Sequence, residues 1–138
     1  TPGIMTQTQP SKEQRGDVDF AWPILQQMLS LDVGQAMAVR ERDTLAVEAV
    51  EGTDRMIERV GKLCKRKGWT LVKAARAGHD RRSDVPTVGL NTIENMARNG
   101  GGCLALAAGE VIMLDKRQMI RRADELGISI VGVPPAEA

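Results

Sequence analysis

The chain has 138 residues, of which 19 are basic and 18 acidic, so its formal net charge is +1. This length is typical of a single domain, and the balanced charge provides no long-range field that would attract nucleic acid or an anionic membrane. Because the chain contains no tyrosine, one phenylalanine and two tryptophans, few rings are available to stack on single-stranded bases. The composition therefore argues against a nucleic-acid-binding protein.

The amino-terminal third predicts a linker, one helix and a hairpin. Residues 1–10 contain prolines and a glycine among threonine and glutamine, which is typical of a linker with nothing to pack. Apolar side chains then recur at helical spacing, and Asp19 is the expected N-cap because Pro23 would then lie in the first turn. The apolar runs 36–39 and 44–50 flank a charged turn and predict a β-hairpin.

The rest of the chain alternates helical and strand-like patterns. Apolar spacing predicts a helix from Asp54 to Lys67, whose acidic start and basic end suit the helix dipole. Asn91 and Glu94 have the spacing of a capping box, and Asp115 is expected to cap the last helix. The expected strands in this part are 69–75, 103–107, 111–114 and 128–131.

This alternation predicts an α/β fold with a mixed, partly parallel sheet packed with helices. We expect one domain over residues 11–133, followed by a short tail at 134–138. The pattern leaves the strand order open. In sheets of this kind, polar loops collect at the carboxyl ends of the parallel strands, so those loops are the first place to look for a site.

One group of polar residues lies between the second strand of the hairpin and the next helix. Glu48, Glu51 and Asp54 place three carboxylates within seven residues, and such a group could hold a hard divalent cation. The amides of Gly52 and Thr53 at the start of the helix could bind a phosphate. The alternative is ordinary helix capping with solvated acidic side chains.

A second polar group is the charged loop that follows Lys73. Its polar side chains are Arg76, His79, Asp80, Arg81, Arg82, Ser83, Asp84 and Thr87. The aspartates could bind a metal or orient water, and the arginines together with Lys73 could bind phosphate oxygens. The alternative is a solvated loop with internal salt bridges. The chain contains no Walker motif, no GxGxxG and no nucleophile elbow.

Three stretches together resemble the carboxyl-terminal domain of the LpxI-type UDP-2,3-diacylglucosamine pyrophosphatases. They are Leu31-Asp-Val-Gly-Gln35, Glu48-Ala-Val-Glu-Gly-Thr-Asp54 and the loop from Lys73 to Gly89. The similarity runs in order from about residue 2 to residue 133. In the loop, Asp80, Arg82 and Asp84 match the family pattern, whereas His79 stands where glutamine is usual.

The resemblance implies a bacterial enzyme of lipid A biosynthesis. Such enzymes use Mg²⁺ and water to split the pyrophosphate of UDP-2,3-diacylglucosamine into UMP and 2,3-diacylglucosamine 1-phosphate. They have two domains with the substrate between them, so this chain would be the catalytic half, inactive alone, and the amino-terminal domain would be missing. A cytoplasmic location is implied, while contact with the inner face of the inner membrane and homo-oligomerisation stay open.

The resemblance also implies roles for individual residues. The expected catalytic residues are Asp80, Arg82, Asp84 and Lys73. Expected phosphate-binding residues are Gly52, Thr53, Arg81 and Thr87. Candidate magnesium ligands are Asp80, Glu48, Glu51 and Asp54. The alternative function is a non-catalytic nucleotide- or phosphate-binding module with the same fold.

Overall fold

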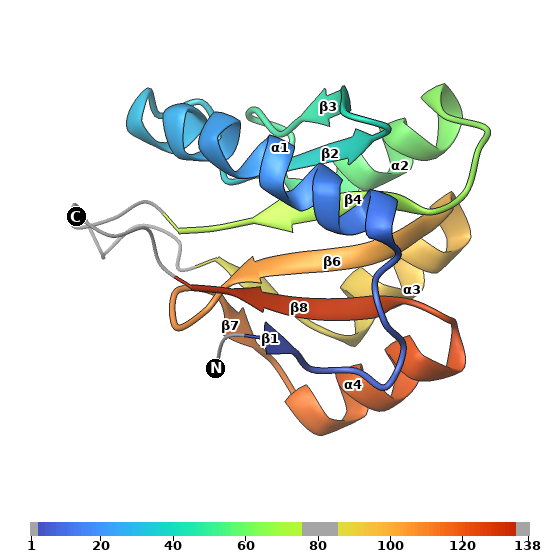
Figure 1. Ribbon diagram of the computed structural model, residues 1–138. Coiled ribbons are helices and arrows are strands. Elements are labelled where there is room, and N and C mark those ends of the chain that lie inside the picture. Colours follow the sequence, from blue (N-terminus) through green and yellow to red (C-terminus); the bar gives the residue numbers. More distant parts are fainter. Residues whose placement is uncertain (1–2, 76–85, 135–138) are drawn as a thin grey trace.

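Six strands form one mixed sheet in the computed structural model, which describes residues 3–75 and 86–134 (Figure 1). In spatial order they are β1 (Gly3–Ile4), β8 (Ser129–Val133), β6 (Gly101–Ala107), β4 (Trp69–Lys73), β2 (Ala36–Arg40) and β3 (Asp43–Val47). The pairs β4–β6 and β6–β8 are parallel, whereas β1–β8, β2–β4 and the hairpin β2–β3 are antiparallel. The structure therefore confirms the predicted α/β fold with a mixed, partly parallel sheet.

Helices cover both faces of this sheet. They are α1 (Lys12–Ser30), α2 (Thr53–Leu63), α3 (Leu90–Asn99) and α4 (Lys116–Glu125). Helix α1 packs on one face across β2 and β4, and the other three helices lie on the opposite face, with α3 between α2 and α4 (Figure 1). Within the described residues, none of these helices combines the length and the apolar character needed to cross a bilayer.

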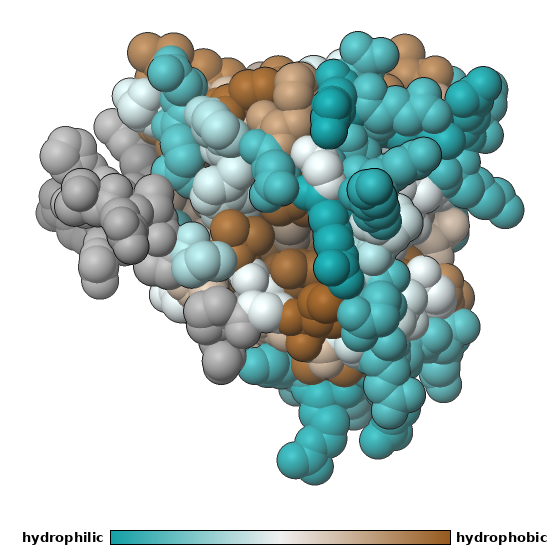
Figure 2. Space-filling view, in the orientation of Figure 1, coloured by the Kyte–Doolittle hydropathy of each residue, from teal (hydrophilic) through white to brown (hydrophobic). Residues whose placement is uncertain are grey.

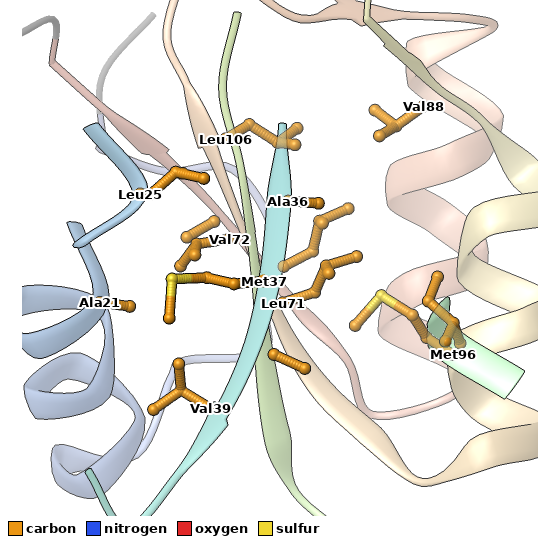
Figure 3. Packing of buried hydrophobic residues seen from close by; sticks show 14 of the residues in the cluster. Ala21, Leu25, Ala36, Met37, Val39, Leu71, Val72, Val88, Met96 and Leu106 are labelled. Carbon is orange, nitrogen blue, oxygen red and sulfur yellow. The ribbon is translucent and has the colours of Figure 1, made fainter. Parts of the chain in front are cut away.

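Apolar side chains fill the space on both sides of the sheet. Figure 3 shows Ala21 and Leu25 of α1 on one side, facing Met37 and Val72, and Met96 of α3 on the other side. Successive strand residues point to opposite faces, so a central strand covered on both sides can be apolar throughout. Strand β4 is buried along its whole length, and this packing fixes the position of its carboxyl end.

Helix α1 leaves the β8 side of its face less covered. Figure 2 views this face and shows apolar surface bordered by charged residues. A shallow groove of about 360 Å³ lies here, and its apolar lining includes Ile4, Val18, Val131 and Val133. None of the residues that line it belongs to the polar cleft at the end of β4.

The predicted linker is wrong for the described part of residues 1–10, because this segment packs on the domain. Gly3–Ile4 forms β1 and pairs with β8, and the Met5 amide donates to the carbonyl of Ile130 at 2.8 Å. The hydroxyl of Thr8 donates to the carboxylate of Asp124 at 2.8 Å, and this carboxylate also accepts the Thr8 amide. Turn-forming composition did not reveal these partners, which lie more than a hundred residues away in sequence.

The N-cap of helix α1 lies eight residues before the predicted one, Asp19. Ser11 caps the helix, because the Gln14 amide donates to the Ser11 hydroxyl at 3.0 Å and the Ser11 amide donates to the Gln14 side chain at 2.9 Å. Asp19 therefore lies inside the helix, and Pro23 lies well beyond the first turn. Proline cannot donate to the carbonyl four residues earlier. Here that residue is Asp19, which is exposed on the surface of the helix.

The predicted capping box at the start of α3 is also wrong. Gly89 is the N-cap, and its amide donates to the hydroxyl of Thr92 at 3.2 Å. Glu94 does not fold back toward Asn91 but forms an ion pair with Arg122 of α4. A tertiary partner thus takes the carboxylate that local spacing had assigned to the helix start.

Two further boundaries and one capping contact differ from the prediction. Helix α2 ends at Leu63, not Lys67, because Cys64 has an extended backbone. The expected buried strand before α4 is only β7 (Ile112–Met113), which pairs in parallel with β5 (Thr87–Val88) as a separate two-stranded sheet. Asp115 is the N-cap of α4, as predicted, but its side chain makes no capping bond. These short elements lie beside the carboxyl end of β4.

Candidate active site

A polar cleft of about 610 Å³ lies at the carboxyl end of β4. Segments from both halves of the chain enclose it, including the starts of β2, α2 and α3 and the whole of β5. Its lining consists of Gln35, Glu48, Thr53, Asp54, Lys73, Pro86, Thr87, Val88, Gly89, Leu90, Asn91, Thr92, Leu114 and Asp115. The cleft therefore lies at the carboxyl-terminal end of a parallel strand, where polar loops were expected.

Three helices begin at this cleft. Thr53 and Asp54 are the first residues of α2, Gly89 is the N-cap of α3, and Asp115 is the N-cap of α4. Glycine N-caps have no side chain that could bond the first amides of a helix, and Gly52 and Gly89 take this position in α2 and α3. Helix N-termini carry partial positive charge and unpaired N–H groups. The cleft is therefore suited to an anion with several oxygens, such as a phosphate.

Among the described residues that line this cleft, Lys73 is the one with a cationic side chain. Its side chain is only 7% exposed, and its ammonium group donates to the carbonyl of Thr87 at 3.0 Å. Burial lowers the pKa of Lys73 below its ordinary value, and the carboxylates of Glu48 and Asp54 act in the opposite direction. A buried ammonium group has lost most of its water, so an anion that enters the cleft would gain a strong partner.

Glu48 lies at the end of β3 and is 8% exposed. One of its carboxylate oxygens accepts the Gln35 amide at 2.9 Å, and the other accepts the Thr53 hydroxyl at 2.5 Å. Each oxygen thus already has a donor from the protein. The structure brings Glu48 into the cleft as predicted, but with a hydrogen-bonding pattern that differs from that of a free metal ligand.

The first turn of α2 places Asp54 at the cleft. Its side chain is exposed, and its backbone carbonyl accepts the side-chain amide of Asn95 from α3 at 3.1 Å. Gly52, just before the helix, has a φ of +89°. Glycine adopts this backbone conformation more readily than other residues because glycine has no Cβ. Asp54 is therefore the predicted carboxylate whose position in the cleft leaves it open to a ligand.

Glu51 is not brought to the cleft. It precedes α2 and forms an ion pair with Arg59 in the second turn of that helix, with an oxygen-to-nitrogen distance of 2.5 Å. The same arginine donates to the carbonyl of Val47 at 3.0 Å. Glu51 thus ties α2 to the end of β3 on the outside of the cleft, and it does not join Glu48 and Asp54 in a shared carboxylate group.

The described residues supply only part of a magnesium site. Over residues 3–75 and 86–134, no three aspartate, glutamate, histidine or cysteine side chains are grouped closely enough to hold a metal ion. Mg²⁺ usually takes one or two carboxylates, keeps several waters and binds substrate phosphates. Asp54 fits this limited role, and the exposed Asp115 is a further carboxylate in the lining of the cleft.

The remaining predicted residues divide into two sets. Thr87 lies in β5 at the cleft and holds Lys73 through its carbonyl oxygen, while its side chain is exposed. The second set belongs to the charged loop and lies outside the described residues. It consists of His79, Asp80, Arg81, Arg82 and Asp84. Their predicted roles stay predictions.

The sequence did not point to several residues of this site. Gln35 and Asn91 line the cleft, and Asn95 reaches the first turn of α2 from 41 positions away. Gln35 ends one of the stretches that carried the family resemblance, so its motif was visible although its contact with Glu48 was not. Helical spacing gave no indication for Asn95, because an amide on a buried helix face has no characteristic pattern.

Two comparisons with known proteins bear on this site. The family model described as the LpxI C-terminal domain matches residues 1–131. A protein from Caulobacter vibrioides (strain ATCC 19089 / CIP 103742 / CB 15), named UDP-2,3-diacylglucosamine pyrophosphatase LpxI, is 36% identical over 142 aligned positions. The alignment covers 98% of this chain and 51% of that protein. The chain therefore spans about half the length of this relative.

Proposed function

This chain belongs to the LpxI C-terminal domain family, and from that premise we propose that it is the catalytic half of a UDP-2,3-diacylglucosamine pyrophosphatase. The whole enzyme would hydrolyse the pyrophosphate bond of this nucleotide-sugar lipid and release UMP and 2,3-diacylglucosamine 1-phosphate. The proposal is supported by the name of the Caulobacter relative, which states this activity for that protein. We place the reaction in the cytoplasm, because nucleotide sugars of this kind are the implied substrates.

The observation that carries the proposal is the position of Lys73 in a cleft where three helices begin. Hydrolysis of a phosphoanhydride requires an in-line water and neutralisation of charge on the phosphoryl oxygens. A buried ammonium group and the unpaired amides at helix starts provide that neutralisation before the substrate arrives. The arrangement is thus matched to the pyrophosphate rather than to the sugar or the acyl chains.

We assign different roles in the reaction to the residues of the cleft according to their chemistry. Lys73 and the first amides of α2 and α3 would bind phosphate oxygens, and Thr53 and Thr87 lie beside them. The carboxylate of Asp54 accepts protons or hydrogen bonds and would orient water. Magnesium, when bound, would add charge neutralisation next to Asp54, with Asp80 as the carboxylate expected from the charged loop.

The second half of the enzyme would complete the binding of the substrate. This cleft is polar, whereas the substrate also carries a uridine and two acyl chains. We propose that the other half of the whole enzyme supplies the remaining contacts, so this chain alone turns over substrate slowly or not at all. Orientation of the reacting groups can contribute about 7 kcal/mol or more to catalysis, and half of the orienting surface would be absent.

The test is UMP release from UDP-2,3-diacylglucosamine by the parent enzyme that contains this sequence, compared with its Asp54→Asn variant. Glu58→Gln is the matched control, because Glu58 is an exposed carboxylate on the same helix that does not line the cleft. We expect Asp54→Asn to lower kcat by about tenfold or more and Glu58→Gln to leave it unchanged. Tight binding of the substrate without any UMP release would instead support the non-catalytic binding module.

A further inference from the structure

The first turn of α2 is held by side chains from two other parts of the chain that no pattern had connected. The Thr53 hydroxyl donates to Glu48, which follows β3, at 2.5 Å. The side-chain amide of Asn95 from α3 donates to the Asp54 carbonyl at 3.1 Å. Both supporting side chains are buried, Glu48 at 8% exposure and Asn95 at 4%. Buried hydrogen bonds of this kind fix geometry, because breaking one leaves an unpaired polar group.

Glu48 itself has little freedom to move toward a ligand. Its backbone amide donates to the carbonyl of Ala36 at 2.9 Å, and its carbonyl oxygen lies where a Cβ on Gly34 would come within 2.0 Å. Gln35 uses both of its backbone groups: the amide donates to the Glu48 carboxylate, and the carbonyl accepts the Ala74 amide at 3.0 Å. One carboxylate thus joins the start of α2 to the end of β4, next to Lys73.

Asn95 is fixed in turn by a neighbour on its own helix. The side-chain amide of Asn99 donates to the Asn95 backbone carbonyl at 2.8 Å and to its side-chain oxygen at 2.9 Å. Because its oxygen is engaged in this way, the nitrogen of the Asn95 amide points to Asp54. Helix α3, through Asn95, therefore helps to fix the position of the first turn of α2 at the cleft.

We propose that Glu48 is a positioning residue that, together with Asn95, holds the first turn of α2 for ligand binding, and that it does not itself bind the metal or the phosphate. Asp54 and the first amides of α2 then make the contacts with the ligand. This inference deepens the proposed function and rests on it for the identity of the ligand. It replaces the expectation that Glu48 is a magnesium ligand.

The proposal predicts different results for two substitutions of Glu48. Glu48→Gln keeps the shape and can still bond both partners, since a threonine hydroxyl can accept as well as donate. Glu48→Leu leaves the Gln35 amide and the Thr53 hydroxyl without an acceptor. We read the position of the turn from NMR-detected hydrogen exchange at Met56, whose amide donates to the Gly52 carbonyl at 3.2 Å.

We expect Glu48→Leu to accelerate exchange at Met56 by about tenfold or more, and Glu48→Gln to stay within about threefold of wild type. Binding of inorganic pyrophosphate with Mg²⁺, measured by calorimetry, should follow the same order. Asp54→Asn should lose affinity with exchange unchanged, and Glu58→Gln should change neither. If Glu48→Gln loses as much affinity as Glu48→Leu while exchange at Met56 stays normal, Glu48 is a direct ligand and the proposal is overturned.

A second pair of variants covers the case in which Glu48→Leu does not fold. Thr53→Val removes the hydroxyl that donates to Glu48 but keeps the shape, and Thr53→Ser restores the hydroxyl. Faster exchange at Met56 in the valine variant, with recovery in the serine variant, supports the positioning role. Normal exchange in both overturns it. If wild type binds no pyrophosphate, the proposed function fails, while the exchange measurements still decide whether Glu48 holds the turn.

Discussion

Replacing Lys73 with methionine tests separately how this buried charge affects the stability of the fold and how it affects phosphate binding. The side chain is 7% exposed, and its recorded hydrogen bond is the one to the Thr87 carbonyl. Methionine fills a similar volume without an ammonium group to desolvate. The lost hydrogen bond costs about 1 kcal/mol, and the variant no longer has to desolvate an ammonium group, a gain on the order of 1 to 2 kcal/mol. We expect the free energy of unfolding of Lys73→Met to be equal to that of wild type or about 1 kcal/mol higher.

The same substitution should weaken phosphate binding strongly. A charge-assisted hydrogen bond is worth about 1.5 to 3 kcal/mol, which corresponds to a loss of roughly 10- to 150-fold in affinity. The function of Lys73 thus comes at a cost in stability, as is common for residues of active sites. Calorimetric titration with inorganic pyrophosphate and Mg²⁺ measures the affinity, and urea unfolding followed by the fluorescence of the buried Trp69 measures the stability.

The pH dependence gives an independent check with a definite sign. Burial lowers the pKa of Lys73 in the folded state below the ordinary value of 10.5. Between the folded pKa and 10.5 the unfolded chain binds more protons, so the free energy of unfolding of wild type should rise with pH through this window. Lys73→Met lacks this rise, and its advantage over wild type should shrink as the pH approaches 10.5. A variant that loses more than about 2 kcal/mol at pH 7, or that binds pyrophosphate as wild type does, would refute the reasoning.

Three further outcomes are expected. Gly34→Ala should lower the free energy of unfolding, measured in urea, by about 3 kcal/mol or more. The reason is that the added Cβ would lie 2.0 Å from the Glu48 carbonyl oxygen. A loss below about 1 kcal/mol would show that the backbone around Glu48 can move to make room for it. Asp80→Ala in the parent enzyme should reduce UMP release by about 100-fold while circular dichroism stays unchanged, and near-normal turnover would exclude Asp80 from the mechanism. Excess chelator should stop hydrolysis and Mg²⁺ should restore it, whereas full activity in chelator would leave Lys73 and the helix starts as the neutralising groups.

Local patterns predicted the elements whose signals are local. The hairpin β2–β3 has a charged turn between two apolar runs, and the apolar stripe of α2 has clear helical spacing. The start of α1 was missed although Ser11 and Gln14 form a capping box, because the apolar spacing is weak there and Pro23 suggested a later start. Spacing within the sequence could not show that β1 reaches across to β8.

The candidate site was predictable to the same extent. Glu48, Thr53, Asp54 and Lys73 were found because their residue types cluster in sequence, and the structure brings them to one cleft. The direction of each side chain was not predictable. Glu51 turns to Arg59 because α2 presents that arginine to it, a relation that depends on the orientation of the helix against the sheet.

Hydrogen exchange of the parent enzyme with and without UDP-2,3-diacylglucosamine, followed by mass spectrometry, tests most directly whether this cleft binds the pyrophosphate. The substrate is supplied as an analogue whose pyrophosphate cannot be hydrolysed, so that it stays intact while Mg²⁺ and Asp54 are both present. We predict that the substrate slows exchange in peptides that contain the first turns of α2 and α3, and that Lys73→Met abolishes this protection. Protection confined to other parts of the chain, with the starts of both helices unchanged, would contradict the assignment of the cleft as the active site.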